Sequence, residues 1–328
     1  MGKKRVLLLC TPVEGIKNVL PRLEKLFELI HLPNACYKDF EENDFSNVYA
    51  IFTNPNRTKI FLGRDIFDSL PNLRVICTAS TGTVHIDCNL AKSKDISIVS
   101  LKNETDFLSK VTSTAELAFT FLLTVVRHII PATHDVVDSE WDCDKFIGKQ
   151  VGDLKVGVLG LGRLGKLFAK YCDCFGAEVS FYDPYVDKVA TLNNVSKVEN
   201  LKDFLCDLDV ISIHIHATEQ NNKFISNEFL EMCKDDVVII NTARGEVVDE
   251  EAMVDFLSRN PKSHYVTDVI NDEVVRHRSP ILQYLQRSFP NGNVTVTPHI
   301  GGMSEGARFL AYNKSLDLFE KYMETENA

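Results

Sequence analysis

Three side chains of this sequence have the types needed for acid–base chemistry on an anionic substrate: Arg244, Glu273 and His299. A guanidinium pairs with a carboxylate through two parallel hydrogen bonds, so Arg244 is suited to holding an acid. An imidazole takes up or releases a proton near neutral pH, which makes His299 the candidate general acid. A carboxylate beside the imidazole would favour its protonated form and hold its orientation, and Glu273 is the candidate for this role. These types predict proton transfer to or from a substrate that carries a carboxylate.

Each of the three residues also has an ordinary alternative. Taken alone, Arg244 would be a solvated surface charge, His299 a turn residue after proline, and Glu273 a loop carboxylate. Their positions favour the chemical interpretation. Each follows a predicted strand at its carboxyl end, where open α/β sheets bind their ligands, so we expect the three side chains to meet at one crevice.

A glycine-rich turn precedes these residues in the chain. The pattern G-x-G-x-x-G occupies Gly160, Gly162 and Gly165, directly after the apolar run Lys155–Leu159 and at the start of a helical pattern. The first glycine permits a tight turn, the second lets the backbone approach a pyrophosphate, and the third lets helix and strand pack closely. The N–H groups at the helix start then favour the anion. A tight turn without a ligand is the alternative.

The strand predicted next, Glu178–Tyr182, favours the dinucleotide over an empty turn. It ends at Asp183, and an acidic residue at this point accepts hydrogen bonds from the adenosine ribose. Pro184 and Tyr185 follow, so no adjacent arginine or lysine is present to hold a 2′-phosphate. The sequence therefore predicts NAD as the cofactor, with NAD favoured over NADP.

Short apolar, β-branched runs alternate with helical patterns along the whole chain. The continuous run 237–240 is typical of a strand covered on both faces, and the alternation predicts parallel sheets built from βαβ units. A helix is expected over 117–130, and Ser304 is placed to cap a last helix over 305–323. The predicted strands are 5–9, 48–52, 73–78, 96–100, 155–159, 178–182, 210–214, 237–241, 264–269 and 293–297.

The length of 328 residues predicts about two domains. The four early strands form one set and the six later strands another. We therefore expect an α/β protein with two Rossmann/flavodoxin-like domains. An NAD-binding Rossmann domain over residues 104–298 would be inserted into a discontinuous, flavodoxin-like substrate domain made of residues 1–103 and 299–328.

The glycine turn and the polar segments together resemble the D-isomer-specific 2-hydroxyacid dehydrogenase family, which includes D-3-phosphoglycerate dehydrogenases, D-lactate dehydrogenases and glyoxylate/hydroxypyruvate reductases. The family pattern N-x-A-R-G is matched at 241–245, D-V with a glutamate five residues after the aspartate at 268–273, and P-H-I-G-G at 298–302. The resemblance implies Arg244, Glu273 and His299 as the catalytic triad. It also implies reversible, NAD-dependent oxidation of a (2R)-2-hydroxy acid to its 2-oxo acid.

The same resemblance implies further binding residues. Positions 80–82 and 86–87 resemble the family's G-x-G-x-D-x-I-D turn, which would place the N–H groups of Thr81 and Gly82 on the substrate carboxylate, together with Arg244 and His299. Asp268 would contact the nicotinamide carboxamide. A homodimer formed through residues around 105–150 is also implied. The full set of expected cofactor-binding residues is Gly160, Gly162, Arg163, Leu164, Gly165, Asp183, His214, Thr218, Thr242, Ala243, Asp268, Gly301 and Gly302.

Three features depart from the family pattern or stand outside it. His216 replaces the proline of H-x-P-L-T, and it is either a surface loop residue or a residue that tunes the cofactor pocket. The segment 271–286 lacks the family's E-E-P and carries Arg276, His277 and Arg278, so it is either a solvated loop or a cover that attracts an anionic substrate. The single tryptophan, Trp141, is expected to be a packing anchor.

Composition and charge exclude several classes of partner. The chain has 46 acidic and 36 basic residues and a net charge of −10, so nucleic acid and membrane surfaces are not expected as partners. Its nine cysteines include no CxxC pair, which favours unpaired thiols in a reducing compartment over a metal site or a disulfide framework. The first apolar run is too short for an export signal. We therefore expect a cytoplasmic protein without a bound metal.

Two other functions stay open on the sequence. The C-terminal-binding corepressors share the family pattern and keep the triad, so an NAD-regulated binding protein is one alternative. A family dehydrogenase with a substrate that is not a hydroxy acid, such as phosphite, is the other. Formate enzymes of the family lack the Glu–His pairing, which argues against formate.

Overall fold

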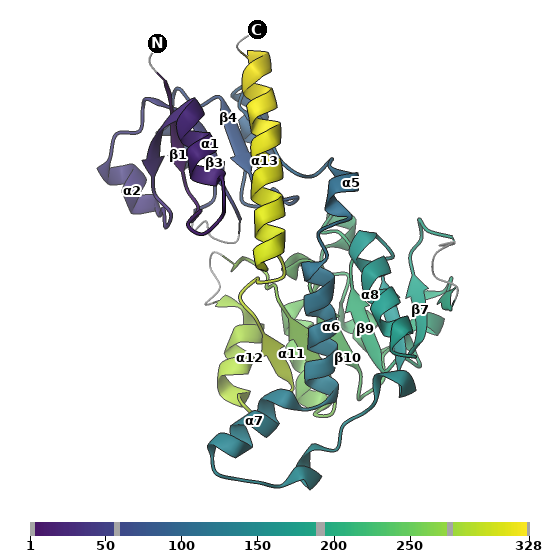
Figure 1. Cartoon of the computed structure of the whole chain (residues 1–328). Helices are drawn as coiled ribbons and strands as arrows, with labels where there is room; N and C mark the ends of the chain where they lie inside the picture. The colour runs from purple at the N-terminus through teal and green to yellow at the C-terminus, as the bar shows by residue number, and fades with distance from the viewer. Residues whose placement is uncertain (1–3, 56–59, 188–193, 274–277, 327–328) are drawn as a thin grey trace. The chain divides into compact units, whose positions relative to one another are not determined.

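Two α/β units make up the chain, and each is built on a parallel sheet (Figure 1). The computed structural model describes residues 4–55, 60–187, 194–273 and 278–326. Unit 1 consists of Met1–Val111 with Met303–Ala328, and unit 2 consists of Thr112–Gly302. The α/β class with two parallel sheets agrees with the prediction from the sequence.

Both boundaries between the two units lie a few residues later in the chain than the sequence predicts. The short helix α5 (Thr105–Leu108) belongs to unit 1, where Glu104 before it pairs with Lys314 at 2.8 Å. At the second boundary, residues 299–302 stay with unit 2 because Asp268 accepts hydrogen bonds from the backbone of this segment. The boundaries therefore lie at 111/112 and 302/303 instead of 103/104 and 298/299.

The sheet of unit 1 has five parallel strands in the order 2-1-3-4-5, the flavodoxin-like order. Its second strand in the chain, β2, is absent from the sequence prediction, because only one of its five residues is buried and it has no continuous apolar run. In sheet order the strands are β2 (Phe27–His31), β1 (Arg5–Leu9), β3 (Val48–Thr53), β4 (Val75–Thr78) and β5 (Ser97–Val99).

Alternate residues of β1 face the two layers of helices that cover this sheet. Leu7 and Leu9 pack with residues of one layer, α1 (Val19–Leu26) and α13 (Glu305–Glu326), and Figure 1 shows these two helices on the same side. Val6 and Leu8 belong to the core on the other side. That layer contains α2 (Tyr37–Glu42), α3 (Arg64–Asp68) and α4 (Cys88–Ser93). The closing helix thus completes the core of unit 1 from the far end of the sequence.

The sheet of unit 2 has seven parallel strands. From the inner strand β6 it runs β6-β7-β8 in one direction and β6-β9-β10-β11-β12 in the other, which is the Rossmann order. The strand β8 is absent from the sequence prediction because it has three residues and none is buried. The strands are β6 (Lys155–Leu159), β7 (Glu178–Tyr182), β8 (Val195–Lys197), β9 (Val210–Ile213), β10 (Val238–Asn241), β11 (His264–Thr267) and β12 (Val294–Val296).

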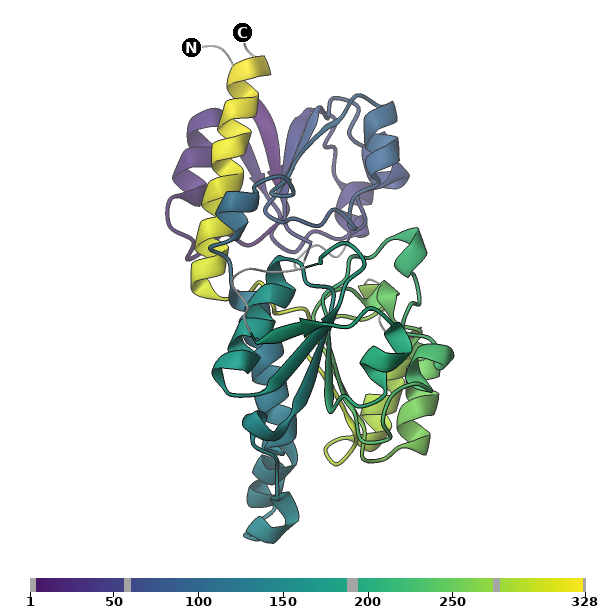
Figure 2. The same ribbon diagram turned by 90° about the vertical axis from the view of Figure 1, so that its right-hand side faces the viewer.

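Helices cover both faces of this sheet, which explains its continuous apolar runs (Figure 2). Val238 and Ile240 pack in the core beneath α6 (Ser113–Val126) and α8 (Arg163–Cys174), whereas Ile239 packs in the core on the opposite face. The opposite layer contains α9 (Leu201–Leu205), α10 (Asn227–Leu230), α11 (Glu250–Arg259) and α12 (Pro280–Ser288). Short 3-10 turns are η1 (Cys143–Phe146), η2 (Val151–Asp153), η3 (Glu219–Asn221) and η4 (Gly245–Val247).

The helix expected over 117–130 is broken before its end. His128 adopts a left-handed backbone conformation with φ +52°, so α6 stops at Val126 and a separate helix, α7 (Ile129–Val137), follows. No residue of α7 is buried, and Trp141 after it is 89% exposed. The expectation that Trp141 anchors packing within this chain is therefore wrong. In the described part of the chain no single helix is long and apolar enough to span a bilayer. The segments Thr105–Val126 and Ile129–Val137 meet the criteria of length and composition only when they are taken together, as a bent pair.

Candidate active site

The glycine turn lies between β6 and α8, as predicted. Gly160 has φ +92°, a left-handed conformation, and a side chain there would approach the backbone carbon of His214 to 3.0 Å. A Cβ on Gly165 would lie 2.2 Å from the carbonyl oxygen of Gly160, so only glycine lets the helix pack this closely on the turn. Gly162 caps the start of α8, and a Cβ built on it meets nothing within 4 Å. The turn therefore offers an open approach to the amino end of a helix, which fits a pyrophosphate.

Asp183 follows β7 and contacts the glycine turn directly. Its Oδ2 accepts a hydrogen bond from the Leu161 N–H at 2.8 Å, and its Oδ1 accepts one from the Tyr185 N–H at 2.8 Å. The carboxylate therefore fixes the turn and stands beside it. Arg163 and Leu164 lie half-buried in the first turn of α8. This position of Asp183 is the one expected for the residue that receives the ribose.

The segment after β9 carries His214, His216 and Thr218. His214 Nε2 lies 2.9 Å from Ser212 Oγ, and burial lowers the pKa of His214 to about 3, so this imidazole is neutral. His216 is exposed, and its carbonyl oxygen accepts a hydrogen bond from the Asn221 side chain. Thr218 is also exposed and caps η3 through its hydroxyl. The geometry around His216 matches the surface loop alternative.

The turn after β10 holds two expected cofactor contacts, Thr242 and Ala243, and is organised by a residue without an assigned role. Asn241 is fully buried; its side chain accepts from the Ala243 N–H and donates to the Arg244 carbonyl oxygen. Thr242 is 5% exposed, and its buried hydroxyl has no hydrogen-bond partner among the described residues. The Thr242 hydroxyl lies at the same edge of the sheet as the glycine turn. A buried hydroxyl without a partner in the protein fits a site where a polar ligand such as a dinucleotide binds.

Arg244 ends this turn. Its Nη1 donates to the carbonyl oxygen of Ala243 at 2.6 Å, and within the described residues it forms no ion pair. A guanidinium without an acidic partner in the chain keeps its capacity for a bidentate carboxylate. Gly245 behind it lies against the next segment, since a Cβ there would stand 2.0 Å from the carbonyl carbon of Ile270. The arginine turn and the segment after β11 are thus in direct contact.

Asp268, at the end of β11, positions the turn that bears His299. The aspartate is 2% exposed, and its carboxylate accepts hydrogen bonds from the N–H groups of Ile300 and Gly301, each at 2.7 Å, and from the Thr297 hydroxyl. Burial raises the pKa of Asp268, and the hydrogen bonds from the turn act in the opposite direction. Both oxygens are thus engaged within the turn, in addition to the nicotinamide contact that the resemblance implies. Gly302, beyond the turn, has open space around its Cα.

His299 and Glu273 form a hydrogen-bonded pair, as the sequence predicts. His299 Nδ1 lies 2.8 Å from Glu273 Oε2, and the histidine has φ +55°, held by its N–H bond to the Asp268 carbonyl oxygen. A carboxylate on Nδ1 selects the tautomer or protonation state with a proton on that nitrogen, so proton transfer falls to Nε2. Of the basic residues predicted in the following loop, Arg278 is described, whereas Arg276 and His277 lie outside the described residues.

In unit 1, the predicted carboxylate cradle follows β4. Within the described residues, the N–H groups of Thr81 and Gly82 donate no hydrogen bond to the chain. The turn is held from behind by a chain of side chains that sequence reasoning did not assign. Ser80 Oγ donates to the Gly82 carbonyl oxygen at 2.7 Å, and Thr78 Oγ1 lies 2.9 Å from Ser80 Oγ and 3.2 Å from His85 Nε2. Burial lowers the pKa of His85 to about 4, so this imidazole is neutral.

Comparisons with known proteins agree with this geometry. Residues 119–301 match the model of the NAD-binding domain of the D-isomer specific 2-hydroxyacid dehydrogenases. A hydroxypyruvate reductase from Thermotoga maritima is 31% identical over 74% of this chain and 76% of its own length. A D-3-phosphoglycerate dehydrogenase from Archaeoglobus fulgidus is 29% identical over 77% of this chain and 46% of its own length, so the chain spans about half of that relative.

Solved structures give the same result for the whole chain. The D-lactate dehydrogenase of Aquifex aeolicus, crystallised with NAD and lactic acid, superimposes with a TM-score of 0.80 at 25% identity and covers 98% of this chain and 96% of its own. The match extends over both sheets, beyond the NAD-binding segment. This chain therefore belongs to the D-isomer specific 2-hydroxyacid dehydrogenase family, and its cofactor is NAD.

Proposed function

We propose that the chain is an NAD-dependent oxidoreductase that interconverts a (2R)-2-hydroxy acid and its 2-oxo acid. The observation that carries this proposal is the 2.8 Å contact between His299 Nδ1 and Glu273 Oε2. The two residues follow adjacent strands of the sheet that also carries the glycine turn. An imidazole oriented by a carboxylate beside a nicotinamide site is the group needed to protonate a carbonyl oxygen.

Each residue has a distinct task in the reductive direction. NADH, when bound, supplies the hydride that adds to C2 of the 2-oxo acid. His299 donates its Nε2 proton to the oxygen on C2 and is held in orientation by Glu273. Arg244 pairs with the substrate carboxylate. In the oxidative direction His299 takes the proton back.

The cofactor preference follows from Asp183. A carboxylate that faces the ribose repels a 2′-phosphate, and the adjacent residues Pro184 and Tyr185 supply no positive charge to offset it. The contact between Asp183 and the Leu161 N–H supports this assignment, because it places the carboxylate beside the glycine turn. We therefore propose that NADH is used in preference to NADPH.

A substrate screen tests the proposed reaction. Purified protein is mixed with NADH and a panel of 2-oxo acids, small and large, phosphorylated and not, and NADH absorbance is followed. Consumption of NADH with at least one 2-oxo acid, and with the His299→Gln variant at least ~100-fold slower, is the expected result. No turnover with any 2-oxo acid would contradict it. NADH-dependent capture of a protein partner would then favour a corepressor-type binding protein, and NAD reduction by phosphite would favour the third candidate.

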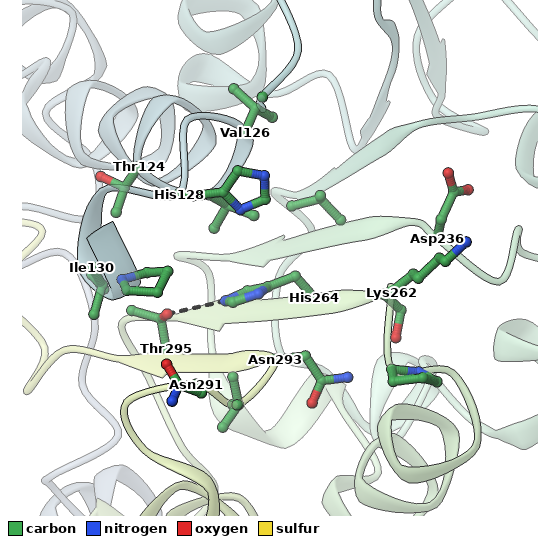
Figure 3. A pocket seen from close by; sticks show the side chains of 18 of the residues that line it. Thr124, Val126, His128, Ile130, Asp236, Lys262, His264, Asn291, Asn293 and Thr295 are labelled. Carbon is green, nitrogen blue, oxygen red and sulfur yellow. Dashed lines mark hydrogen bonds between the residues drawn. The ribbon is translucent and has the colours of Figure 1, made fainter. Parts of the chain in front are cut away.

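We also propose a homodimer formed through residues around 105–150, most of which lie in unit 2. The surface of unit 2 has a groove of about 610 Å³ next to α6 and α7, in which His264 donates to or accepts from Thr295 at 3.0 Å (Figure 3). The groove is lined by neither Arg244, Glu273 nor His299. Apolar side chains on α7, in the segment after it and at the end of α12 are at least half exposed in one chain, which supports their burial against a second copy; of these, Ile147 and Phe289 line the groove. The exposed apolar side chains are Ile129, Val136, Val137, Trp141, Ile147 and Phe289.

Sedimentation tests the homodimer. The wild-type chain is expected to sediment at twice its 37.0 kDa mass. Val137→Asp, which places a charge on α7 where the side chain is 76% exposed, should give a monomer. Val84→Asp in unit 1 is the matched control, because Val84 is also exposed but lies far from α7 in the chain. A monomeric wild type, or a Val137→Asp variant that stays dimeric, would contradict the proposal.

We further propose that the protein works in a reducing compartment, the cytoplasm. None of its nine cysteines is in a disulfide, and several are buried in the cores of the two units. The buried thiols Cys10, Cys77 and Cys172 behave as small apolar side chains there. Localisation of a tagged full-length chain by microscopy would test this placement.

A further inference from the structure

Glu250 is a buried acid at the start of α11 and has no task in the reaction described above. Its exposed fraction is 7%, whereas Glu251, the next residue of the same helix turn, is exposed. Acidic residues are common in the first turn of a helix because they face the positive end of its dipole. That explanation suits Glu251, but it does not account for burying the carboxylate of Glu250, which costs free energy unless its oxygens are hydrogen-bonded.

Both carboxylate oxygens of Glu250 are hydrogen-bonded, and they hold the two ends of one segment. Oε1 accepts from the Asn271 N–H at 2.8 Å, and Oε2 accepts from the Ser279 hydroxyl at 2.5 Å. Ser279 is itself 4% exposed, and its oxygen caps α12 by accepting from the Leu282 N–H. The segment between Asn271 and Ser279 carries Glu273.

The start of this segment is fixed from a second side. Gly245 lies against the backbone of Ile270 and Asn271, so that α11 and the turn before it form a single support. Glu273 is two residues beyond Asn271, and Asp272 between them has φ +50°, a left-handed bend. The hydrogen bond between the Asn271 N–H and Glu250 therefore determines where the backbone of Glu273 lies.

We infer that Glu250 is a positioning residue, which holds Glu273 against His299 by clamping Asn271, two residues before Glu273, while its second oxygen fixes Ser279. The inference rests on the proposed function, because it assigns a task to the pair that performs acid catalysis. Glu250 touches neither substrate nor cofactor in this account. Its effect on catalysis passes through Glu273, and this distinguishes it from a residue that only stabilises unit 2.

A double-mutant cycle tests the clamp. Glu250→Ala is expected to lower kcat/KM by about 100-fold, because the carboxylate of Glu273 is then displaced by about an ångström or more. In a Glu273→Ala background, the same substitution should lower kcat/KM by little more, since its target is already gone. Glu251→Ala is the matched control and should leave kcat/KM unchanged. Equal losses in both backgrounds would overturn the inference, because they would indicate a general structural effect.

A conservative variant gives a second readout. Glu250→Gln keeps an acceptor for the Asn271 N–H and should retain most of the wild-type rate. It also keeps the inference testable if Glu250→Ala does not fold, because a folded Glu250→Gln enzyme as slow as Glu273→Ala would overturn the inference.

A readout without turnover separates this inference from the proposed function. In histidine-labelled full-length protein, the Nδ1 proton of His299 is observed by NMR and assigned with His299→Gln. The signal is expected in wild type and in Glu251→Ala, and its loss is expected in Glu250→Ala. A persistent signal in Glu250→Ala refutes the clamp even if no substrate is found, whereas a chain with the clamp but without any turnover refutes the proposed function.

Discussion

The contact between Gly245 and the segment after β11 supports the sharpest prediction. A Cβ at this position would lie 2.0 Å from the Ile270 carbonyl carbon, 2.1 Å from its oxygen and 2.3 Å from the Asn271 nitrogen. Carbon atoms in ordinary contact are about 3.5 Å apart. In Gly245→Ala the two segments must therefore separate by about 1.5 Å. All three obstructing atoms are backbone atoms, so no side-chain rotation relieves the overlap.

This separation moves either the turn that carries Arg244 or the segment that carries Glu273. A misplacement of about 1 Å at a reacting centre lowers the rate by about 100-fold, so kcat/KM for the 2-oxo acid should fall by about that factor. Overpacking should lower the free energy of unfolding by about 1–3 kcal/mol.

Steady-state kinetics on the accepted 2-oxo acid, with urea unfolding in parallel, checks both numbers. Gly306→Ala is the control, because a Cβ there meets nothing within 4 Å and Gly306 lies in the first turns of α13. It should leave kcat/KM unchanged and stabilise the protein slightly, since alanine is the better helix former. A folded Gly245→Ala enzyme with nearly normal kcat/KM would refute the reasoning that this contact sets the distance between Arg244 and Glu273.

Three further predictions concern the rest of the molecule. His85, His214 and His264 have folded pKa values of about 4, 3 and 4, below the ordinary ~6.5, so the unfolded chain binds the extra protons. Above pH ~6.5 these histidines are neutral in both states and do not lower the free energy of unfolding. As the pH falls toward their folded pKa values, the unfolded chain takes up protons that the folded chain does not, so at pH 5 each histidine lowers the free energy of unfolding by about 2 kcal/mol. The urea midpoint should therefore drop between pH 7 and pH 5. An unchanged midpoint would contradict this. Asp183→Ala should weaken NADH binding and reduce the ratio of NADH affinity to NADPH affinity, both measured by fluorescence titration. An NADH affinity equal to that of the wild type would contradict the proposed contact between Asp183 and the ribose. A thiol reagent should modify the native chain rapidly only at its exposed cysteines, Cys88, Cys143, Cys174 and Cys206, and rapid reaction of Cys10 or Cys77 would contradict the described burial.

All the central strands and two of the edge strands, β5 and β12, were predictable from the sequence, whereas the edge strands β2 and β8 were not. The continuous apolar run 237–240 predicts a central strand, because a strand covered on both faces has apolar residues on both. The structure has β10 at this position. The strands β2 and β8 lie at sheet edges and bury few residues, so their sequences carry no apolar pattern. The break at His128 depends on a backbone conformation that residue type alone does not specify.

The candidate site shows the same division. Residue type and position at strand ends were enough to predict the pairing of Glu273 with His299. The contacts of Asp268 could not be predicted, since its carboxylate meets the N–H groups of residues more than thirty positions away, and only the folded sheet brings them together. Glu250 was missed for a related reason. In sequence it resembles any acid at a helix start, and its burial arises only when Asn271 and Ser279 are brought against it in the folded chain.

Isotope transfer tests the central claim most directly. The wild-type chain is given NADH deuterated at C4 and a 2-oxo acid from the screen, and the product is analysed by mass spectrometry and chiral separation. The account predicts a 2-hydroxy acid of R configuration that carries the deuterium at C2, and loss of this product in the His299→Gln variant although NADH still binds. A product of S configuration, a product without deuterium, or a His299→Gln variant as active as wild type would contradict it.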